Sequence, residues 1–291
     1  MRFLTALALT AITSASAFAT PLVGQPTDGN LGFQPGVTPI MEQVNDFHNI
    51  LLWIIIPISV FVMGLLGWII IRYNKKANPV PAKFSHNTLL EVVWTGIPVL
   101  ILVVISFFSF PLLYLQDTIP SDPDGEIPPA EFTIKAVGYQ WYWGYEYPDH
   151  GIEEFASTMI ADEDLRPDQP RNLAVDQPIV IPVDTTIRLQ VVAADVIHNW
   201  AMPAFGTKMD AIPGRINEAW FHVTEEGTFY GQCSELCGLR HAFMPIEVHA
   251  VSRDVFDRWV EMVAEDPYSE EAYQLIADNS AERMTRLAQL D

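Results

Sequence analysis

Two long apolar runs dominate the hydropathy pattern of the first half of the chain. Residues 50–71 and 92–115 contain no charged side chain, and each is long enough to cross about 30 Å of hydrocarbon as an α-helix. Their prolines and glycines are compatible with this, because neighbouring helices in a membrane can satisfy the backbone carbonyls that such residues free. The pattern therefore predicts two transmembrane helices, over 50–71 and 92–115, in a lipid bilayer.

A shorter apolar stretch lies at the N-terminus. Residues 1–19 begin with Met1-Arg2, are apolar in the middle and end in Ala17-Phe18-Ala19, the small-residue pattern of a signal-peptidase site. We predict a secretory signal peptide over 1–19 that is removed. The alternative, an uncleaved membrane anchor, would need about 20 apolar residues, more than this stretch provides.

The charges between the two long runs predict their orientation. The segment 72–91 carries four basic residues before its first acid, Glu91, so the positive-inside rule makes it a cytoplasmic loop. Both termini then lie outside the cytoplasm, with 20–49 as an external N-terminal loop. The expected location is the bacterial inner membrane, with residues 116–291 in the periplasm. The basic residues are Arg72, Lys75, Lys76 and Lys83.

Beyond the second run, the pattern changes to short β-type segments. Residues 116–130 are rich in proline and acid and are predicted to be a linker. Short strands separated by turn residues, with no helical pattern between them, are typical of an antiparallel sandwich or barrel, here over 131–251. Residues 252–291 are predicted to form a helix followed by an acidic tail. The predicted strands are 131–137, 139–147, 178–182, 186–193, 216–223, 227–232 and 244–251.

The charge balance excludes one class of partner and divides the chain in two. The 291 residues carry 16 basic and 36 acidic side chains, for a formal charge of −20. A nucleic acid would repel a chain this acidic, so no nucleic-acid partner is expected. Only Asp28, Glu42, Asp46 and Glu91 of the acids precede residue 116. The exterior domain therefore carries the negative charge.

The segment Gly231–Met244 concentrates the side chains that can bind a metal. It contains both cysteines of the chain, Cys233 and Cys237, followed by His241 and Met244. Thiolate, imidazole and thioether together suit copper, whereas calcium and magnesium prefer oxygen. Two thiolates can bridge a pair of copper ions, each completed by one histidine and one weak ligand. We expect the second histidine to be His198, at the end of the strand from Thr186 and the start of a loop.

Two simpler interpretations of this segment stay open at this point. The cysteines could form a disulfide in an exported domain, although that would leave His241 and Met244 unexplained. A zinc site with two cysteines and two histidines is also possible and would not use the methionine. The other histidines stand alone in the sequence and are expected to be surface or packing residues: His48, His86, His150, His222 and His249.

An aromatic pattern precedes this segment. Trp141, Trp143, Tyr145 and Tyr147 alternate along the strand predicted over 139–147, which is typical of the core face of a sandwich. The functional alternative is that one exposed indole conducts electrons inward from a docked protein.

Several acids have two interpretations as well. Four neighbouring acids could be a solvated turn or could steer a basic partner: Glu146, Asp149, Glu153 and Glu154. Glu91 could simply reach water at the membrane boundary, or it could take up protons there.

Together these motifs resemble subunit II of the haem-copper cytochrome c oxidases of the aa3 type, found in mitochondria and their bacterial relatives. The similarity covers nearly the whole mature chain. The C-x3-C-x3-H-x2-M spacing is highly specific and is shared mainly with nitrous oxide reductase, a soluble enzyme without the helical hairpin. The motifs that carry it are Leu31-Gly32-Phe33-Gln34, Pro39-Ile40-Met41-Glu42, Gly138-Tyr139-Gln140-Trp141-Tyr142-Trp143, Asp210-Ala211-Ile212-Pro213-Gly214-Arg215, and Gly231 through Pro245.

The resemblance implies a cupredoxin-like Greek-key domain with a binuclear copper A centre. It makes Cys233 and Cys237 the bridging ligands, with His198 and His241 as terminal ligands. Met244 and the backbone carbonyl of Glu235 would be the weak axial pair, and the Glu235 side chain would contact a magnesium ion at the interface with subunit I. The insert around 160–171 and the tail after 260 depart from the family.

The resemblance also implies a function and partners. Electrons from reduced cytochrome c would enter through Trp141 and pass to haem a of subunit I, which also holds haem a3 and copper B and reduces oxygen to water coupled to proton pumping. Subunit III is a further expected partner, and this chain alone should not reduce oxygen. Glu91 matches the entrance of the K proton path. The alternative function is a membrane-tethered copper-delivery or sensing protein. The expected docking acids are Glu146, Asp149, Glu153, Asp195 and Asp210.

Overall fold

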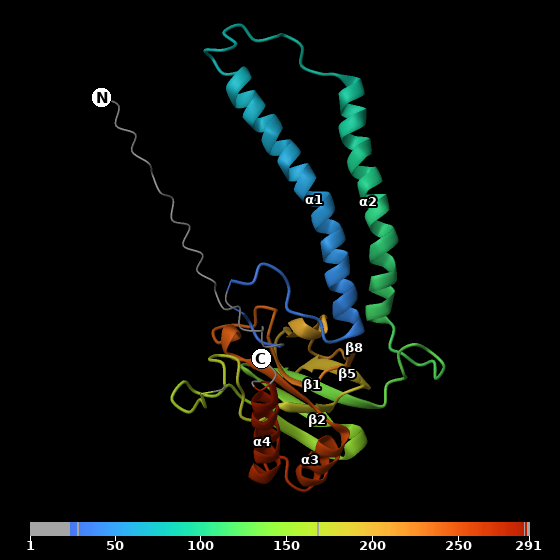
Figure 1. Ribbon diagram of the computed structural model, residues 1–291, viewed down its shortest axis with the longest axis vertical. Coiled ribbons are helices and arrows are strands. Elements are labelled where there is room, and N and C mark those ends of the chain that lie inside the picture. The colour runs from blue at the N-terminus through green and yellow to red at the C-terminus, as the bar shows by residue number, and fades with distance from the viewer. Residues whose placement is uncertain (1–23, 28, 168, 288, 290–291) are drawn as a thin grey trace, which may run out of the picture.

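Two long helices extend from one end of a β domain, and two shorter helices lie at its other end (Figure 1). The computed structural model describes residues 24–27, 29–167, 169–287 and 289, so the predicted signal peptide lies outside the described residues. The long helices are α1 (Pro39–Arg72) and α2 (Thr88–Asp117), and the shorter ones are α3 (Arg253–Glu265) and α4 (Glu270–Leu287).

The long helices α1 and α2 have the length and composition of membrane spans. Their most apolar windows have mean hydropathies of 2.7 and 2.5, and no residue of those windows is buried inside the protein. In water such an exposed apolar surface would be strongly unfavourable, so it is suited to lipid. Both helices also extend beyond the predicted runs.

Helix α1 begins at Pro39 rather than at residue 50, so the prediction that 20–49 is entirely a loop is wrong. The Thr38 hydroxyl caps the helix by accepting from the Met41 N–H at 3.1 Å and also donates to the Phe205 carbonyl at 2.7 Å. Ile40 and Met41 are buried. The first turn of α1 therefore packs on the β domain, and a sequence of mixed polarity is helical there because of that packing.

Helix α2 begins at Thr88, inside the segment predicted as the cytoplasmic loop. Asn87 caps it by accepting from the Leu90 N–H at 3.2 Å. The predicted boundary at 92 followed the apolar run, whereas the helix itself starts at its cap.

The β domain has ten strands in the described residues, in three sheets. The five-stranded sheet has the order β3-β2-β1-β5-β8, the three-stranded sheet β4-β10-β9, and the third pairs β6 with β7. The strands are β1 (Phe132–Tyr139), β2 (Tyr142–Tyr147), β3 (Ile152–Ser157), β4 (Ile179–Pro182), β5 (Thr185–Ala193), β6 (His198–Met202), β7 (Thr207–Ala211), β8 (Asn217–Val223), β9 (Gly227–Gln232) and β10 (Pro245–Val251).

The sheets are mixed rather than purely antiparallel as predicted. Strand β1 pairs parallel with β5, and β10 pairs parallel with β4. Parallel neighbours need a long connection, and the chain between them in each pair is long enough to supply one. Alternation within single strands does not reveal which strands become neighbours, so this feature could not be predicted from the pattern.

Three strands were missed by the sequence pattern: β3, β6 and β7. All five residues of β6, His198–Met202, are buried, so this strand lacks the apolar and polar alternation that identifies a half-exposed strand. The prediction that His198 begins a loop is therefore wrong, because His198 is the first residue of β6. The error matters because a strand holds a side chain more rigidly than a loop.

The C-terminal region covers the far side of the β domain. Helix α3 buries Val255, Phe256, Trp259 and Val263, which confirms the predicted helical stripe. The following residues are not simply a solvated tail, because Ala272 and Ile276 of α4 are buried in the core. Few positions of α4 are buried, and its exposed face carries several acids. The sequence pattern therefore does not reveal which face of this helix packs on the domain.

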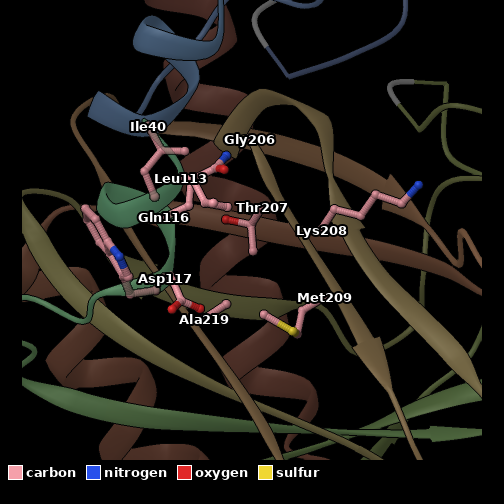
Figure 2. A pocket seen from close by; sticks show the side chains of 10 residues that line it. Ile40, Leu113, Gln116, Asp117, Gly206, Thr207, Lys208, Met209 and Ala219 are labelled. Carbon is pink, nitrogen blue, oxygen red and sulfur yellow. The ribbon is translucent and has the colours of Figure 1, made fainter. Parts of the chain in front are cut away.

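A pocket of about 290 Å³ lies where the long helices meet the β domain (Figure 2). Ile40 of α1 and Leu113 of α2 line it together with Thr207 and Met209 of β7. Beside it, the Trp220 indole N–H donates to the Leu115 carbonyl at 3.0 Å. These contacts fix the β domain at the ends of the two long helices.

Candidate metal centre

The two cysteines lie in the loop between β9 and β10. Cys233 and Cys237 are 5% and 3% exposed, and their Sγ atoms are 3.9 Å apart. Both are free thiols, since a disulfide would require about 2.05 Å. The disulfide interpretation is therefore wrong for this structure, and two buried sulfurs face each other across a space that could hold metal.

His198 brings an imidazole to these sulfurs from a distant part of the sequence. Its side chain is fully buried, and its Nδ1 atom lies 3.9 Å from Cys233 Sγ. Three residues each offer one potential ligand atom here, and these atoms lie within 4.8 Å of one another: His198, Cys233 and Cys237. Gly138 leaves the room for the ring, because a Cβ atom at 138 would lie 2.7 Å from His198 Cδ2.

The other predicted donors of the loop join the same cluster. His241 Nδ1 and Met244 Sδ each lie 3.5 Å from Cys237 Sγ. The backbone carbonyl of Glu235 lies 3.4 Å from Cys233 Sγ, while the Glu235 side chain is exposed. All six predicted donors, which also include His198, thus come together, with Glu235 taking part through its backbone carbonyl.

A carboxylate holds His198 from its far side. Nε2 of His198 donates to Asp195 Oδ1 at 2.9 Å, which leaves Nδ1 directed at the sulfurs. Asp195 also accepts the backbone N–H groups of Gln140 at 2.7 Å and Val196 at 2.6 Å. Partial burial alone would raise the pKa of Asp195, but these hydrogen bonds hold it below its ordinary value. A carboxylate behind an imidazole is a common arrangement at metal sites, because it orients the ring and raises its basicity.

The two thiols titrate very differently. Burial opposes ionisation of both, but hydrogen bonds from His198 and the backbone lower the pKa of Cys233 to about 7. Burial and the negative charge of Cys233 raise the pKa of Cys237 to about 12. One thiolate is therefore readily formed, and a cation would favour the second by offsetting the repulsion between them.

Trp141 lies next to the cluster, but not where the pattern predicted. Strand β2 begins at Tyr142, so half-buried Trp141 belongs to the turn before it, while Trp143, Tyr145 and Tyr147 are fully buried. The predicted core face is confirmed for those three residues only. A Cβ atom at Gly238 of the ligand loop would lie 3.1 Å from the Trp141 ring, so the two are in close contact.

Gln140 was missed by the sequence analysis. Its side-chain amide donates to the Cys237 carbonyl at 2.8 Å, and its backbone N–H donates to Asp195. The turn that carries Trp141 is therefore fastened both to the ligand loop and to the carboxylate behind His198. The only sequence signal was its place in the motif beside Trp141.

The expected docking acids occupy different settings. Glu146 forms an ion pair with Lys135 at 2.7 Å, Asp149 accepts the Thr133 N–H, and Asp210 accepts from the Asn199 amide. Exposed Glu153 lies on β3. Of the five expected acids, Asp195 alone hydrogen-bonds to the turn of Trp141 in the part of the chain that the structure describes. Glu154, which the sequence grouped with the possible steering acids but not with the docking set, accepts from the Tyr139 hydroxyl at 2.7 Å.

Glu91 is remote from the cluster. It lies in the first turn of α2, and its Oε1 atom accepts the Asn87 N–H at 3.2 Å. The β domain packs at the other end of that helix (Figure 1). The Glu91 carboxylate thus has a structural role at the start of helix α2. Any role of Glu91 in proton uptake would be separate from the metal cluster.

The donor chemistry of the cluster fits copper. Two thiol sulfurs, one thioether and two imidazoles converge with a single backbone carbonyl. Soft sulfur and imidazole donors select copper, whereas a four-coordinate zinc site would leave the methionine unused. The residues present are therefore able to hold copper ions.

Comparison with known protein families matches the β domain and the region of the two long helices separately. The family model "Cytochrome C oxidase subunit II, periplasmic domain" matches residues 132–251, and "Cytochrome C oxidase subunit II, transmembrane domain" matches residues 26–112. The second match includes the first turn of α1 on the β domain, the whole first apolar run and most of the second.

Individual relatives are similar over most of the chain. The probable cytochrome c oxidase subunit 2 of Rickettsia felis is 52% identical over 249 residues, which cover 86% of this chain and 75% of that protein. Cytochrome c oxidase subunit 2 of Cereibacter sphaeroides is 42% identical over 283 residues, which cover 90% of each. The crystal structure of the periplasmic domain of subunit II of cytochrome oxidase from Bradyrhizobium japonicum is 55% identical, with a TM-score of 0.45, and covers 49% of this chain and 99% of that one.

Proposed function

The chain belongs to the cytochrome c oxidase subunit II family, and we propose that its sulfur and imidazole cluster holds the binuclear copper A centre. The protein is an electron-transfer subunit of a haem-copper oxidase, a membrane protein with two spans and a periplasmic domain. The single observation that carries the copper proposal is that four buried side chains, those of Cys233, Cys237, His198 and Met244, converge with part-buried His241 at one site.

In this proposal each donor has its own role. Cys233 and Cys237 would be the thiolate ligands shared by the two copper ions, and His198 and His241 would each supply one imidazole. Met244 and the Glu235 carbonyl would complete the site as weak ligands. A copper pair held by these residues would supply one-electron redox chemistry between cytochrome c and haem a of subunit I. The β9–β10 loop and β6 keep the donors in place, which limits rearrangement on electron transfer.

The surface around Trp141 is where we propose that electrons enter. The indole touches the ligand loop at Gly238, and Gln140 fixes its turn to the Cys237 carbonyl. The strongly negative charge of the chain favours a basic partner such as cytochrome c. The proposed docking acids are Glu146, Asp149, Glu153, Asp195 and Asp210.

Further assignments follow from the family resemblance. Exposed Glu235 would contact a magnesium ion at the interface with subunit I, and Glu91 would take up protons at the cytoplasmic entrance of the K path. Subunit I would supply haem a3 and copper B for oxygen reduction and proton pumping, with subunit III as a further partner. The protein would lie in the bacterial inner membrane, with its N-terminus and β domain in the periplasm and its helix-connecting loop in the cytoplasm.

Metal analysis and electron paramagnetic resonance of the purified oxidised chain test the copper proposal. We expect two copper ions per chain and hyperfine coupling spread over two copper nuclei. A copper-delivery protein should instead bind one cuprous ion and give no signal, and a zinc site should contain zinc. Either result would overturn the proposal.

The electron route has a separate test. Trp141→Phe should leave the copper spectrum unchanged while slowing electron uptake from cytochrome c. Raising the salt concentration should weaken docking, because it screens surface charges. Unchanged uptake in the variant would remove Trp141 from the route, and a reaction insensitive to salt would remove the docking acids.

A further inference from the structure

Trp143 is a buried tryptophan that the proposed electron route does not use. It lies on β2, two residues after Trp141, and its side chain is fully buried. The sequence predicts it as an ordinary residue of the core face, and its burial agrees with that. Its contacts go beyond packing, however, because the indole reaches two of the proposed copper ligands.

Strand pairing determines on which side of the sheet the Trp143 side chain lies. Trp143 of β2 is directly opposite Gly138 of β1 in an antiparallel ladder. Residues that are directly opposite in such a ladder point to the same face of the sheet. A Cβ atom at Gly138 would meet the His198 ring at 2.7 Å, so His198 lies on that face. The indole of Trp143 is therefore on the same face as His198.

The indole of Trp143 contacts the imidazole of His198. The centroids of the two rings are 6.0 Å apart and their planes are inclined by 61°, which is an edge-to-face arrangement. Aromatic rings favour this arrangement at centroid separations of about 4.5–7 Å. Asp195 holds the Nε2 atom of the same imidazole at 2.9 Å. Trp143 and Asp195 together therefore restrict both the tilt and the rotation of the His198 ring.

The same indole also holds the backbone of Met244. Its Nε1–H donates to the Met244 carbonyl at 3.3 Å, and both residues are buried. Burial alone does not supply such an acceptor, because the equally buried indole N–H of Trp259 has no hydrogen-bond partner in the part of the chain that the structure describes. The bond thus fixes the residue whose Sδ atom lies 3.5 Å from Cys237 Sγ.

Trp143 therefore joins two parts of the cluster that are far apart in the sequence. His198 begins β6, whereas Met244 lies at the end of the loop between β9 and β10. The indole contacts the Met244 carbonyl and the His198 ring, and it leaves the Met244 Sδ and His198 Nδ1 atoms available to a metal. A supporting side chain of this kind, held on a strand, keeps ligands in a defined geometry.

We propose that Trp143 is a positioning residue of the copper centre, which fixes the Met244 thioether and the His198 imidazole relative to each other. This inference rests on the proposed function, because it assigns Trp143 a role toward the copper pair. The weak axial ligand of a copper site tunes its redox potential. Trp143 therefore influences the potential through Met244, while Trp141 remains the proposed point of electron entry.

Replacing the indole in the full chain tests this role. Trp143→Phe removes the hydrogen-bond donor and part of the ring. We expect copper affinity, measured by competition with a chelator, to fall by about tenfold. The copper hyperfine splitting in electron paramagnetic resonance should change. The midpoint potential in a redox titration should rise, because a thioether that is held less firmly stabilises oxidised copper less.

Trp259→Phe is the matched control. It also removes a fully buried indole, but Trp259 lies on α3 and its ring contacts Tyr147 and Phe256 instead of the cluster. Affinity, hyperfine splitting and potential should equal those of the unmodified chain.

An isosteric replacement separates the hydrogen bond from the shape of the ring. Trp143→3-benzothienylalanine keeps the bicyclic ring and exchanges its N–H for a sulfur atom, which cannot donate to the Met244 carbonyl. The splitting and the potential should change in this variant as well. If Trp143→Phe does not fold, this variant decides the question.

The outcomes distinguish this inference from the proposed function. If the unmodified chain holds two copper ions and the Trp143 variants keep its affinity, splitting and potential, the positioning role is overturned and the proposed function stands. Equal changes in Trp143→Phe and Trp259→Phe would also overturn the positioning role, because loss of packing would explain both. Absence of a copper pair from the unmodified chain would overturn the proposed function and this inference with it.

Discussion

The Asp195 carboxylate lies 2.9 Å from Nε2 of His198 and binds the far side of the imidazole whose Nδ1 faces the sulfur cluster. The same carboxylate accepts the backbone N–H of Gln140, next to Trp141. One side chain thus fixes both the buried histidine and the turn proposed for electron entrance. The sequence predicts Asp195 only as a docking acid, whereas these contacts give it a positioning role as well.

Replacing this carboxylate should weaken copper binding. Asp195→Asn keeps the size of the side chain but removes the charge that orients and polarises His198. Loss of such a partner typically lowers metal affinity by about 10–100-fold. Competition with a copper chelator measures the affinity, and Glu153→Gln is the control because that acid is exposed. Equal copper retention in the two variants would leave Asp195 without a positioning role.

A methyl group at position 138 should displace His198. In Gly138→Ala the new Cβ atom would lie 2.7 Å from the imidazole, closer than packed atoms approach. We expect incomplete copper loading and an altered copper spectrum after reconstitution. Gly32→Ala is the control, because no atom lies within 4 Å of a Cβ atom there. A normal spectrum in Gly138→Ala would show that the ring can move without consequence.

Cutting the bond between the Trp141 turn and the ligand loop should slow electron uptake without removing copper. Gln140→Ala deletes the amide that donates to the Cys237 carbonyl. Stopped-flow oxidation of reduced cytochrome c measures the effect. Gln190→Ala, which removes a bond to Glu218 instead, is the comparison and should react at the normal rate. Equal rates would mean that packing against Gly238 is sufficient to hold Trp141.

The phenol of Tyr139 provides a test of pH dependence. Its hydrogen bond to Glu154, together with burial, raises its pKa to about 12. The folded state therefore favours the protonated phenol, and this contribution to stability is complete below about pH 10, the unfolded value, and is lost as pH rises through 12. Glu154→Gln should lower the pKa, which NMR of ¹³C-labelled tyrosine can follow. No shift would mean that burial dominates.

The contribution of α3 to stability can be measured through Trp259, which is fully buried. Trp259→Ala should destabilise the protein by about 3–5 kcal/mol, because it removes a large apolar side chain and leaves a cavity. Chemical denaturation followed by circular dichroism gives the value. Leu239→Ala is the control, since that side chain is 89% exposed and its loss should change stability by less than about 0.5 kcal/mol. Similar values for the two would place α3 outside the cooperative core.

The sequence by itself determined the features that depend on neighbouring residues. The two spans follow from the length of the apolar runs, and four of the proposed metal ligands lie within twelve residues of each other, where spacing alone is informative. The helical stripe of α3 is likewise a local pattern. In each case the sequence pattern and the structural feature that it predicts occupy the same short segment of the chain.

Only the tertiary structure decided how distant segments combine. It brought His198 on β6 to the β9–β10 loop, with Gly138 making room and Asp195 and Gln140 holding the parts together. It also packed the first turn of α1 on the β domain and placed α4 over His249. These arrangements rest on strand pairing and burial between residues far apart in the chain, and neither leaves a periodic pattern in the sequence.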